Sequence, residues 1–347
     1  MTDFEIRKLP PETPLRVPMS LSFPATFTAL DSWTQLVKEI YGYETYRLEA
    51  MQNNEVTGIL ALTHVRHPIF GNYLSTSPFG SFGGFVFSST EARDGLLNEA
   101  KKLADELKVD YVVVRFIEDG NVPSPSWIQN PIYSTYLIDL PSNPEDLMQT
   151  FGHQHRKHTR QSLRKGFKVK FGRFELLDET YKALAQSMRE LGSPYHSKKY
   201  LQKMASLLGD NLEFVLIMDA DDSLVGGAVL VYHEMTATNL HANILHKYRA
   251  EYAGECLYWN ILEYYIQKGI KTCDMGRSLN GSGNETFKFK WKPRKVPLAY
   301  WYYLPKGGHI PELNQKSPKF QFAIWLWKRL PAFAVRMLGP HLIRGIV

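Results

Sequence analysis

Hydrophobic and polar positions alternate in two stretches of the chain that have the same layout. In the first, YRLEAMQNNEVTGILALTHV (46–65), two apolar strands flank a polar turn at 52–55. In the second, EFVLIMDADDSLVGGAVLVYH (213–233), the turn lies at 219–223. A period of two on either side of turn-forming residues predicts a β-hairpin. Each stretch is therefore expected to form one.

Each predicted hairpin is followed by a further strand region, a helix and a short apolar strand. The first helix is expected over about 92–107, and a strand follows at 111–116. The second helix is expected over about 254–268, and a strand follows at 271–275. Both helices carry an apolar stripe at helical spacing. A repeated order of elements predicts a tandem duplication of one α/β unit with mixed sheets.

The boundary between the two copies is expected near 140–150. The stretch DLPSNPEDL (139–147) offers turn residues, and Ser142 or Asn143 can cap a helix that begins at Pro144. The predicted domains are residues 1–145 and 146–310. The apolar, aromatic and basic residues 311–347 are expected to form a C-terminal helical tail.

Composition fits a cytosolic protein of two domains. The chain has 347 residues, of which 44% are hydrophobic and 22% charged. Its only cysteines, Cys256 and Cys273, exclude a disulfide framework or a zinc ribbon. The first twenty residues lack the apolar core of a signal peptide, and no uncharged apolar run is long enough to span a bilayer. The net charge of +6 fits an anionic partner or ordinary solubility.

The loop after the last predicted strand of the second copy, DMGRSLNGSGNETFKFKW (274–291), has the chemistry of an anion site. The planar fork of Arg277 suits a phosphate or a carboxylate, or an internal salt bridge to Asp274 or Glu285. Ser278 and Asn280 can donate to the same anion or hold the turn. Asp274 can orient Arg277 or act as a general base.

Alternation in FKFKW predicts a strand. Lys288 and Lys290 would lie on one face of it, and Phe287, Phe289 and Trp291 on the other. The pattern alone favours a solvated lysine at position 288. The alternative is a donor to the oxyanion of an acyl-transfer intermediate, which is worth roughly 10²–10³ in rate.

A strongly basic stretch, HQHRKHTRQSLRKGFKVKFGR (153–173), has eight lysines and arginines and no acid. If 153–165 is helical, Arg156, Arg160 and Arg164 stack on one face, with Lys165 beside them. An RNA backbone or the phosphates of coenzyme A would relieve their repulsion, and so would an acidic patch of the same protein. The three histidines are not expected to bind metal, because cations surround them and no acid or cysteine is near.

Two further segments have a functional and a structural interpretation. FGNYLSTSPFGSFGGF (70–85) either forms an acceptor groove, lined by Tyr73, Ser77, Phe79 and Phe82, or is a glycine-rich connection. In the tail, 319–338 combines tryptophans with lysine and arginine. Such a helix lies on a membrane or docks on its own domain.

The loop, the first-domain segment and the tail together resemble one known family. CDMGRSLNGSGNETFKFKW followed by VPLAYWYYL is similar to the D-x-G-R-S and F-K-x-x-W signature of FemAB-like transferases of the GNAT superfamily. RHPIFGNYLSTSPFGSFGGFV (66–86) and SPKFQFAIWLWKRLP (317–331) resemble the branch associated with exosortase and exopolysaccharide systems. The resemblance covers nearly the whole chain.

The resemblance implies two GNAT-like domains that transfer an aminoacyl or acyl group to an amine of a cell-envelope precursor. The donor would be aminoacyl-tRNA or acyl-CoA, with no permanently bound cofactor. Lys288, Arg277, Ser278 and Asp274 become the expected catalytic residues. The basic helix would bind the donor, and Asn280, Phe287 and Trp291 would contact substrate. The first domain would present the acceptor, and the enzyme would work in the cytoplasm, with a tail able to reach the inner membrane face.

The chain departs from the family pattern in two places. Lys292 follows Trp291 where the family usually has glycine, and no stretch between 150 and 215 is long enough for the helical arm of some members. Two alternatives therefore remain beside cell-envelope transfer. One is an acyl-CoA-dependent N-acyltransferase acting on an amino sugar or small amine. The other is a non-catalytic protein that binds RNA or glycan on the same fold.

Overall fold

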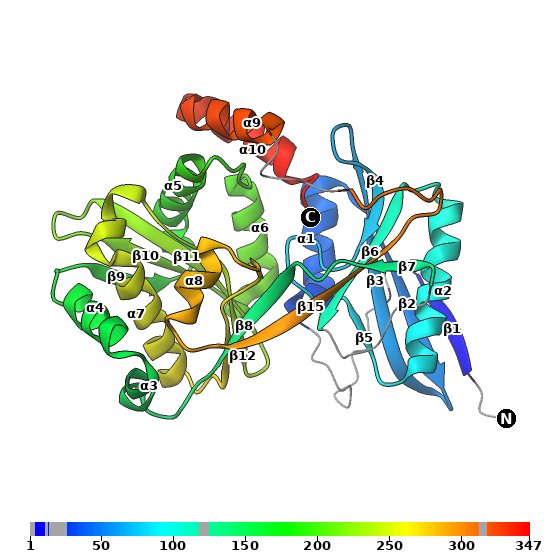
Figure 1. Ribbon diagram of the computed structural model, residues 1–347, viewed down its shortest axis with the longest axis horizontal. Coiled ribbons are helices and arrows are strands. Elements are labelled where there is room, and N and C mark those ends of the chain that lie inside the picture. Colours follow the sequence, from blue (N-terminus) through cyan, green and yellow to red (C-terminus); the bar gives the residue numbers. More distant parts are fainter. Residues whose placement is uncertain (1–3, 11–12, 14–25, 118–124, 312–317) are drawn as a thin grey trace. The chain divides into compact units, whose positions relative to one another are not determined.

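The computed structural model describes residues 4–10, 13, 26–117, 125–311 and 318–347. The chain divides into two compact units. The first contains residues 1–134, 296–312 and 344–347, and the second contains residues 135–295 and 313–343. Each unit has its own mixed sheet and its own helices (Figure 1).

The first unit is a mixed sheet with strand order β1-β2-β3-β4-β6-β15. All neighbours pair antiparallel except β4 and β6, which are parallel. Short strands β5 and β7 pair with β3 and β15. The elements are β1 (Phe4–Leu9), η1 (Phe27–Ala29), α1 (Asp31–Tyr41), β2 (Thr45–Gln52), β3 (Glu55–His67), β4 (Gly71–Ser75), β5 (Phe85–Phe87), α2 (Thr90–Glu106), β6 (Tyr111–Ile117), β7 (Trp127–Gln129) and β15 (Arg294–Tyr303).

Helix α2 supplies one side of the first core. Ser89 caps its start by accepting a hydrogen bond from the Ala92 amide at 3.1 Å. The apolar stripe predicted for this helix is buried, and Leu96 packs in one cluster with Leu60 of β3 and Trp301 of β15. Burial of this stripe, more than local propensity, holds the helix in place.

The second unit has the strand order β8-β13-β12-β11-β10-β9, in which only β12 and β13 pair parallel. Its elements are β8 (Tyr133–Asp139), α3 (Pro144–Thr150), α4 (His153–Leu163), β9 (Lys168–Gly172), α5 (Phe174–Leu191), α6 (Lys198–Leu208), η2 (Gly209–Asn211), β10 (Leu212–Met218), β11 (Leu224–His233), β12 (Thr236–Ile244), η3 (His246–Glu251), α7 (Ala253–Gln267), β13 (Thr272–Asp274), β14 (Ser278–Leu279), α8 (Gly283–Phe289), α9 (Pro318–Arg329) and α10 (Ala332–Ile343).

Helices α5 and α7 cover opposite faces of the second sheet (Figure 1). A Cβ on Gly227 of β11 would lie 3.1 Å from the Thr180 side chain of α5. The next residue, Ala228, is in the core cluster with Leu257 and Leu262 of α7. Since neighbouring residues of a strand point to opposite faces, the two helices lie on either side of the sheet.

The predicted α/β fold with a duplicated unit is confirmed. In each unit a hairpin and a further strand, β4 or β12, precede a helix, α2 or α7, and the strand after the helix pairs parallel with β4 or β12. Both hairpins form, as β2–β3 and β10–β11. Asn143 caps α3 by accepting from the Glu145 amide at 2.9 Å, as the sequence indicated.

The observed units divide the chain differently from the expected ranges. The second unit begins at Thr135, because β8 pairs with β13, where the sequence suggested 145/146. From Val296 the chain returns to the first unit, because β15 pairs with β6 from Leu298 to Tyr303. The tail helices group with the second unit. Long-range strand pairing of this kind leaves no mark on local sequence pattern.

Candidate active site

The parallel pair β12–β13 is short, and its two strands separate where the DMGRS motif begins. Pairing covers three positions and ends at Thr238 and Asp274. Strand β12 continues to Ile244, whereas the segment after β13 turns at Gly276, whose φ is +76°. The motif therefore occupies a point where a sheet opens. Its backbone groups are largely paired: the carbonyls of Gly276 and the residue after it accept from Lys288, and β14, which follows, pairs with β8.

The FKFKW stretch forms a helix, α8, which corrects the predicted strand. Ser282 caps the helix by accepting from the Glu285 amide at 3.3 Å. The glutamate in turn accepts a hydrogen bond from the Gly281 amide. Ser282 and Glu285 thus stand in the S-x-x-E spacing of a capping box, a helix signal that outweighs the short alternation after it.

Lys288 is buried and lies against the opened end of the sheet. Its side chain is 7% exposed, and Nζ donates to the carbonyl oxygens of Gly276 at 2.6 Å and Arg277 at 3.1 Å. Nζ also lies 5.2 Å from the centroid of the Tyr136 ring. An ammonium has three donors, so one N–H remains beyond the two carbonyl bonds.

The pKa of the Lys288 ammonium lies closer to neutral pH than that of an ordinary lysine. Burial lowers its pKa to about 8, while the charge of Asp274 acts in the opposite direction. Lys288 contacts Arg277, another of the expected catalytic residues. The contact runs through the backbone carbonyl of the arginine, which makes the lysine a support of the loop as well as a cation within it.

Asp274 and Ser278 frame the same turn. Asp274 is 4% exposed and accepts from the Thr135 hydroxyl at 2.5 Å and the Gly276 amide at 2.8 Å. Burial raises the pKa of its carboxyl. The Ser278 hydroxyl is buried and has no hydrogen-bond partner within this fully described stretch. Because a buried hydroxyl is costly to leave unsatisfied, Ser278 is a candidate to bond a ligand.

Glu285 ties the glycine turn to strand β8. It accepts from the Tyr136 hydroxyl at 2.6 Å and pairs with Lys295 at 2.7 Å. The Lys295 and Tyr136 hydrogen bonds hold the pKa of its carboxyl at about 2. The sequence suggested Glu285 as one partner for Arg277, and the structure assigns it to Lys295. Arg277 is partly buried and Asn280 is exposed.

Phe287 and Trp291 are structural residues of the core, which corrects their expected contact with substrate. Trp291 is fully buried between α4 and α7, against Phe151 and His155. Phe287 packs on Tyr258. Trp291 follows the end of α8 and belongs to the core cluster of the second unit, and Phe287 is partly buried against that cluster.

The basic stretch forms a helix as expected, and part of its charge is matched within the protein. Arg156 donates to the carbonyls of Gln149 and Phe151 at the end of α3. Arg160 pairs with Glu145 at 3.3 Å and Lys165 with Glu251 at 3.4 Å. Arg164 is exposed. The two ion pairs are solvent-exposed and contribute little, so both explanations of the helix, an internal acidic patch and an external anion, keep support.

Helix α4 packs beside the start of α7, a feature that the sequence reasoning missed. His158 of α4 stacks on Tyr252 at 4.1 Å, and Tyr252 precedes α7 with a φ of +59°. No side chain caps the first turn of this 15-residue helix. An uncapped helix start carries free backbone N–H groups and a partial positive charge, which attract an anion.

The proposed acceptor residues of the first unit are packed inside it, which corrects the expected groove. Tyr73 is 3% exposed and donates to the Gly345 carbonyl at 2.8 Å. The Ser77 hydroxyl accepts from the Gly84 amide at 2.9 Å, and Phe82 is buried. Phe79 packs on Tyr41, with ring centroids 5.0 Å apart. These contacts support the alternative interpretation, a glycine-rich connection.

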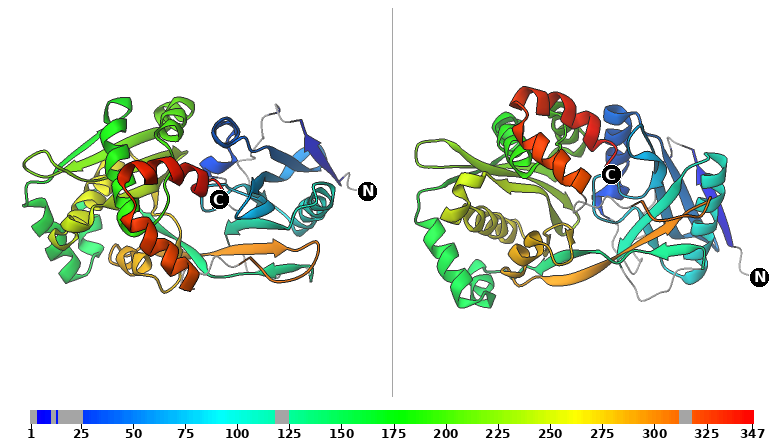
Figure 2. Two further views of the ribbon diagram at one scale, coloured as in Figure 1. Left: turned by 90° about the horizontal axis from the view of Figure 1, so that it is seen from above. Right: turned by 45° about the horizontal axis from the view of Figure 1, so that its top comes forward.

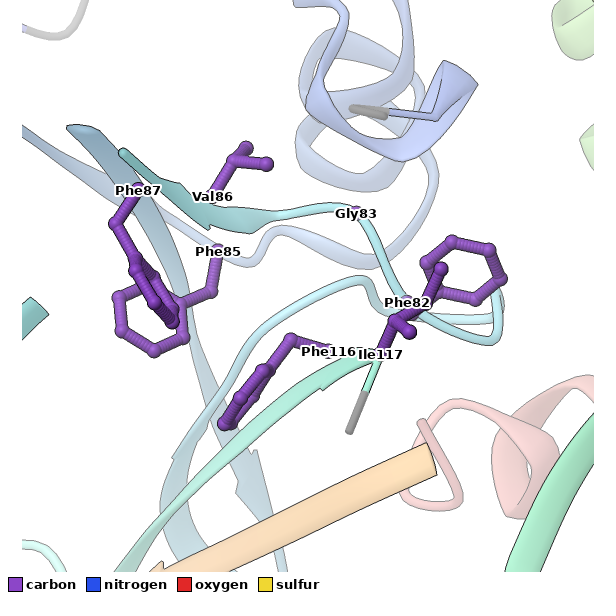
Figure 3. A pocket seen from close by; sticks show the side chains of 7 residues that line it. All are labelled: Phe82, Gly83, Phe85, Val86, Phe87, Phe116 and Ile117. Carbon is purple, nitrogen blue, oxygen red and sulfur yellow. The ribbon is translucent and has the colours of Figure 1, made fainter. Parts of the chain in front are cut away.

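A void beside this connection is too small for a substrate. It measures about 10 Å³, room for no more than about one water molecule. Figure 3 shows the rings of Phe85, Phe87 and Phe116 gathered at it. The lining is apolar, so the void is a packing defect of the core.

Comparison with known proteins agrees with the fold. Residues 153–289 match the family described as acetyltransferase (GNAT) domain. FemX superposes with a TM-score of 0.62 at 16% identity, over 87% of this chain and 96% of that chain. A tandem GNAT protein from the clavulanic acid biosynthesis pathway gives 0.56 at 11% identity, over 88% and 100%. L-PGS from Bacillus licheniformis gives 0.53 at 13%, over 89% and 94%. No curated protein sequence is significantly similar to the chain.

At these identities the solved structures establish the fold, and the family match identifies the chemistry of the second unit. That unit contains an acyltransferase domain of the GNAT class. The predicted acyltransferase chemistry is confirmed for the second unit, and the predicted fold of two GNAT-like units agrees with FemX and with the tandem GNAT protein. The assignment to the exosortase-associated branch stays a prediction. Among the described residues, no helix is both long and apolar enough to cross a membrane.

Proposed function

We propose that the protein transfers an aminoacyl or acyl group to an amine of a cell-envelope precursor, and that the transfer takes place at the opened end of β12 and β13. The observation that supports this most directly is Lys288. Its ammonium is buried, is fixed by the Gly276 and Arg277 carbonyls, and keeps one donor. A preorganised donor in a dry site is the most effective way to stabilise a developing oxyanion.

The reaction needs no covalent enzyme intermediate. The acceptor nitrogen attacks the donor carbonyl, a C–N bond forms, and the carbonyl oxygen becomes negative. Collapse of this intermediate breaks the C–O bond of an aminoacyl ester or the C–S bond of a thioester. The proton lost by the nitrogen ends on the departing oxygen or sulfur.

Each predicted catalytic residue then has a distinct role. Lys288 donates to the oxyanion, and Ser278 adds its unpaired hydroxyl to the same charge. Asp274 is a positioning residue, because its contacts with Thr135 and Gly276 fix the turn. Arg277 is proposed to contact an anionic part of the donor. The general base is left to the substrates, since every described contact of Asp274 serves the turn.

The donor is proposed to bind across α4 and the start of α7. Exposed Arg160 and Arg164 supply positive charge on α4, and His158 of the same helix lies against the uncapped start of α7. The match to an acetyltransferase family favours an acyl-CoA donor. The similarity to FemAB-like proteins favours an aminoacyl-tRNA. Both present phosphates, so the site accommodates either chemistry. Placement of the acceptor on the first unit and a cytoplasmic location stay predictions.

The test is a transfer assay with both donors and a matched pair of lysine variants. Labelled aminoacyl-tRNA and acetyl-CoA are each offered with an amino sugar and with a peptidoglycan precursor. Lys288→Met should reduce turnover by roughly 10²–10³ while donor binding persists. Lys182→Met is the control, because that lysine is exposed on α5, where it pairs with Glu179; it should retain turnover. Equal activity of the two variants would overturn the role of Lys288. Binding of a donor without any transfer would favour the non-catalytic alternative.

A further inference from the structure

The two tail helices present an unusual amount of apolar surface. Six large hydrophobic side chains of α9 and α10 are between 44% and 67% exposed. Over the whole described part of the chain only nine other large hydrophobic side chains are exposed. Single exposed apolar residues are normal, but a cluster is a feature of an interaction surface. The six are Phe322, Trp325, Leu326, Phe333, Met337 and Leu338.

These side chains do not belong to the face with which the tail docks. Helix α9 packs on the second unit through Trp327, which is 8% exposed and donates to the Ser193 carbonyl at 3.1 Å. Helix α10 packs through Gly339, where an added Cβ would lie 2.9 Å from the Tyr195 carbonyl oxygen. Figure 2 shows both helices, in red, over the surface of this unit. Of the two expectations for the tail, docking on its own domain and contact with a membrane, the structure thus shows the first.

The second expectation, contact with a membrane, concerns the faces of the tail helices that point away from the second unit. On α9, Phe322, Trp325, Leu326 and Arg329 follow the i, i+3, i+4, i+7 spacing of one helical stripe. This stripe lies on the other side of the helix from Trp327. Phe322 and Trp325 stack with centroids 5.8 Å apart, and the Arg329 guanidinium lies 3.8 Å over the Trp325 ring. Aromatic rings with a cation beside them match the boundary between lipid headgroups and acyl chains.

The charge of the tail selects among possible occupants. Residues 318–347 contain five lysines and arginines and no acid. Lys328, Arg329 and Arg336 are exposed alongside the apolar residues. A second copy of this chain would bring the same positive surface against itself, which is unfavourable. An anionic bilayer supplies both the apolar phase and the opposite charge.

We propose that the outer faces of α9 and α10 form a docking surface for an anionic lipid bilayer. Binding is peripheral: the helices lie in the interface while their inner faces stay on the second unit. The proposal does not depend on the identity of the donor or the acceptor, and it fails or succeeds separately from the transfer reaction.

The test uses the full chain and vesicles, with no activity readout. The protein is sedimented with vesicles of phosphatidylcholine alone and with vesicles that also contain phosphatidylglycerol. We expect at least about tenfold tighter binding to the anionic vesicles, because each basic residue near such a surface contributes about 1 kcal/mol. Raised salt should reduce that difference.

Paired variants locate the surface. The double variant Trp325→Gln, Phe333→Gln should weaken vesicle binding by about tenfold or more. Two aromatic side chains that would be buried in the lipid are then lost. The control replaces Ile69 and Met235, which are 68% and 50% exposed outside the tail, by glutamine; it should bind as the parent does. Circular dichroism confirms that both double variants are folded. Equal binding by the two pairs would overturn the proposal.

Fluorescence adds a second readout. Brominated lipid should quench emission from Trp325, and Trp325→Phe should remove that quenching while retaining vesicle binding. Concentration-dependent sedimentation that is abolished by the tail pair, without vesicle binding by the parent, would mean that a second copy covers this face. That result would also reject the lipid surface.

Discussion

The two units each bury a cation next to their parallel strand pair, but the two cations differ in chemistry. In the first unit Arg115 lies 5.2 Å over the Tyr300 ring and donates to the Val347 carbonyl. In the second unit Lys288 lies 5.2 Å over the Tyr136 ring and donates to two carbonyls. A cation thus lies on a tyrosine ring in both units, but Arg115 belongs to β6 itself, whereas Lys288 comes from α8.

The ends of the two parallel pairs also differ. In the first unit the chain itself fills the space after β4: the Thr76 amide donates to the Val113 carbonyl, and the Thr76 hydroxyl accepts from the Arg115 amide at 2.8 Å. Among the described residues, the Ser278 hydroxyl and the Asn239 side-chain nitrogen of the second unit are buried without hydrogen-bond partners, and so are Nε and Nη1 of Arg115 in the first unit. The first junction uses Thr76 to satisfy its backbone groups, whereas the second holds a buried hydroxyl that a ligand can satisfy. Together with the family match within the second unit, this difference supports the proposal that the second junction is the reactive one.

The largest expected effect is a pH dependence of turnover, which follows from the difference between Lys288 and the arginine of the first unit. With a pKa of about 8, Lys288 loses its proton near neutral pH, whereas arginine does not. The groups that set this value are Asp274, Cys273 and Arg277, in addition to burial. If the ammonium stabilises the oxyanion, turnover should fall about tenfold per pH unit as the pH rises above about 8.

The measurement is kcat against pH for the parent and for Lys288→Arg. The arginine variant, if it retains activity, should lack the alkaline decline. A rate that rises through pH 8 would indicate a lysine base, and it would contradict the assigned role. The same shift makes stability rise with pH between about 8 and 10.5, because the unfolded chain then binds more protons than the folded one.

A smaller effect is expected from the hydroxyls that distinguish the two junctions. Ser278→Ala should lower turnover by about tenfold, the loss of one modest hydrogen bond to the transition state. It should leave the melting temperature nearly unchanged, because the hydroxyl has no described partner. Thr76→Val removes the acceptor of a buried amide and should cost about 1–3 kcal/mol of stability.

Steady-state kinetics and thermal unfolding of the two variants test the comparison directly. Thr76→Val should retain the kcat of the parent at a temperature where it is folded. If the threonine variant loses turnover and the serine variant loses stability, the assignment of roles to the two junctions is reversed. A loss of both properties in both variants would show that the junctions are not distinct.

The sequence predicted more of the fold than of the site. The stripes of α2 and α7 and the turn residues of both hairpins carry local signals, so these elements were predictable. The position of β15 was not, because its pairing with β6 depends on contacts far apart in the chain. The burial of Tyr73 and Phe82 could not be predicted from the sequence either. Aromatic residues in a glycine-rich segment give the same sequence pattern whether they line a groove or pack in a core.

The site shows where a motif informs and where it misleads. The resemblance in the DMGRS and FKxxW motifs singled out Lys288 and Arg277, and in the structure the lysine bonds the Gly276 and Arg277 carbonyls. The alternation inside the motif suggested a strand, although the S-x-x-E spacing at Ser282 indicates a helix. Thr135 and Tyr136, which hold Asp274 and Glu285, lie more than a hundred residues away. No pattern along the chain marks such support.

The smallest expected effect concerns Lys292, where the chain departs from the family pattern. Its φ is +53°, the left-handed conformation that glycine adopts without strain, and it directly follows the buried Trp291. The lysine therefore adopts the backbone conformation that the family glycine would adopt.

A non-glycine residue in this conformation costs roughly 1–2 kcal/mol of stability. Replacement by glycine removes this strain, but part of the gain is lost because glycine makes the unfolded chain more flexible. Lys292→Gly should stabilise the protein by up to about 1 kcal/mol. Thermal unfolding should show the gain, while Lys292→Ala, which keeps the Cβ, should not. A destabilised glycine variant would mean that the lysine side chain, and not the backbone, maintains this turn.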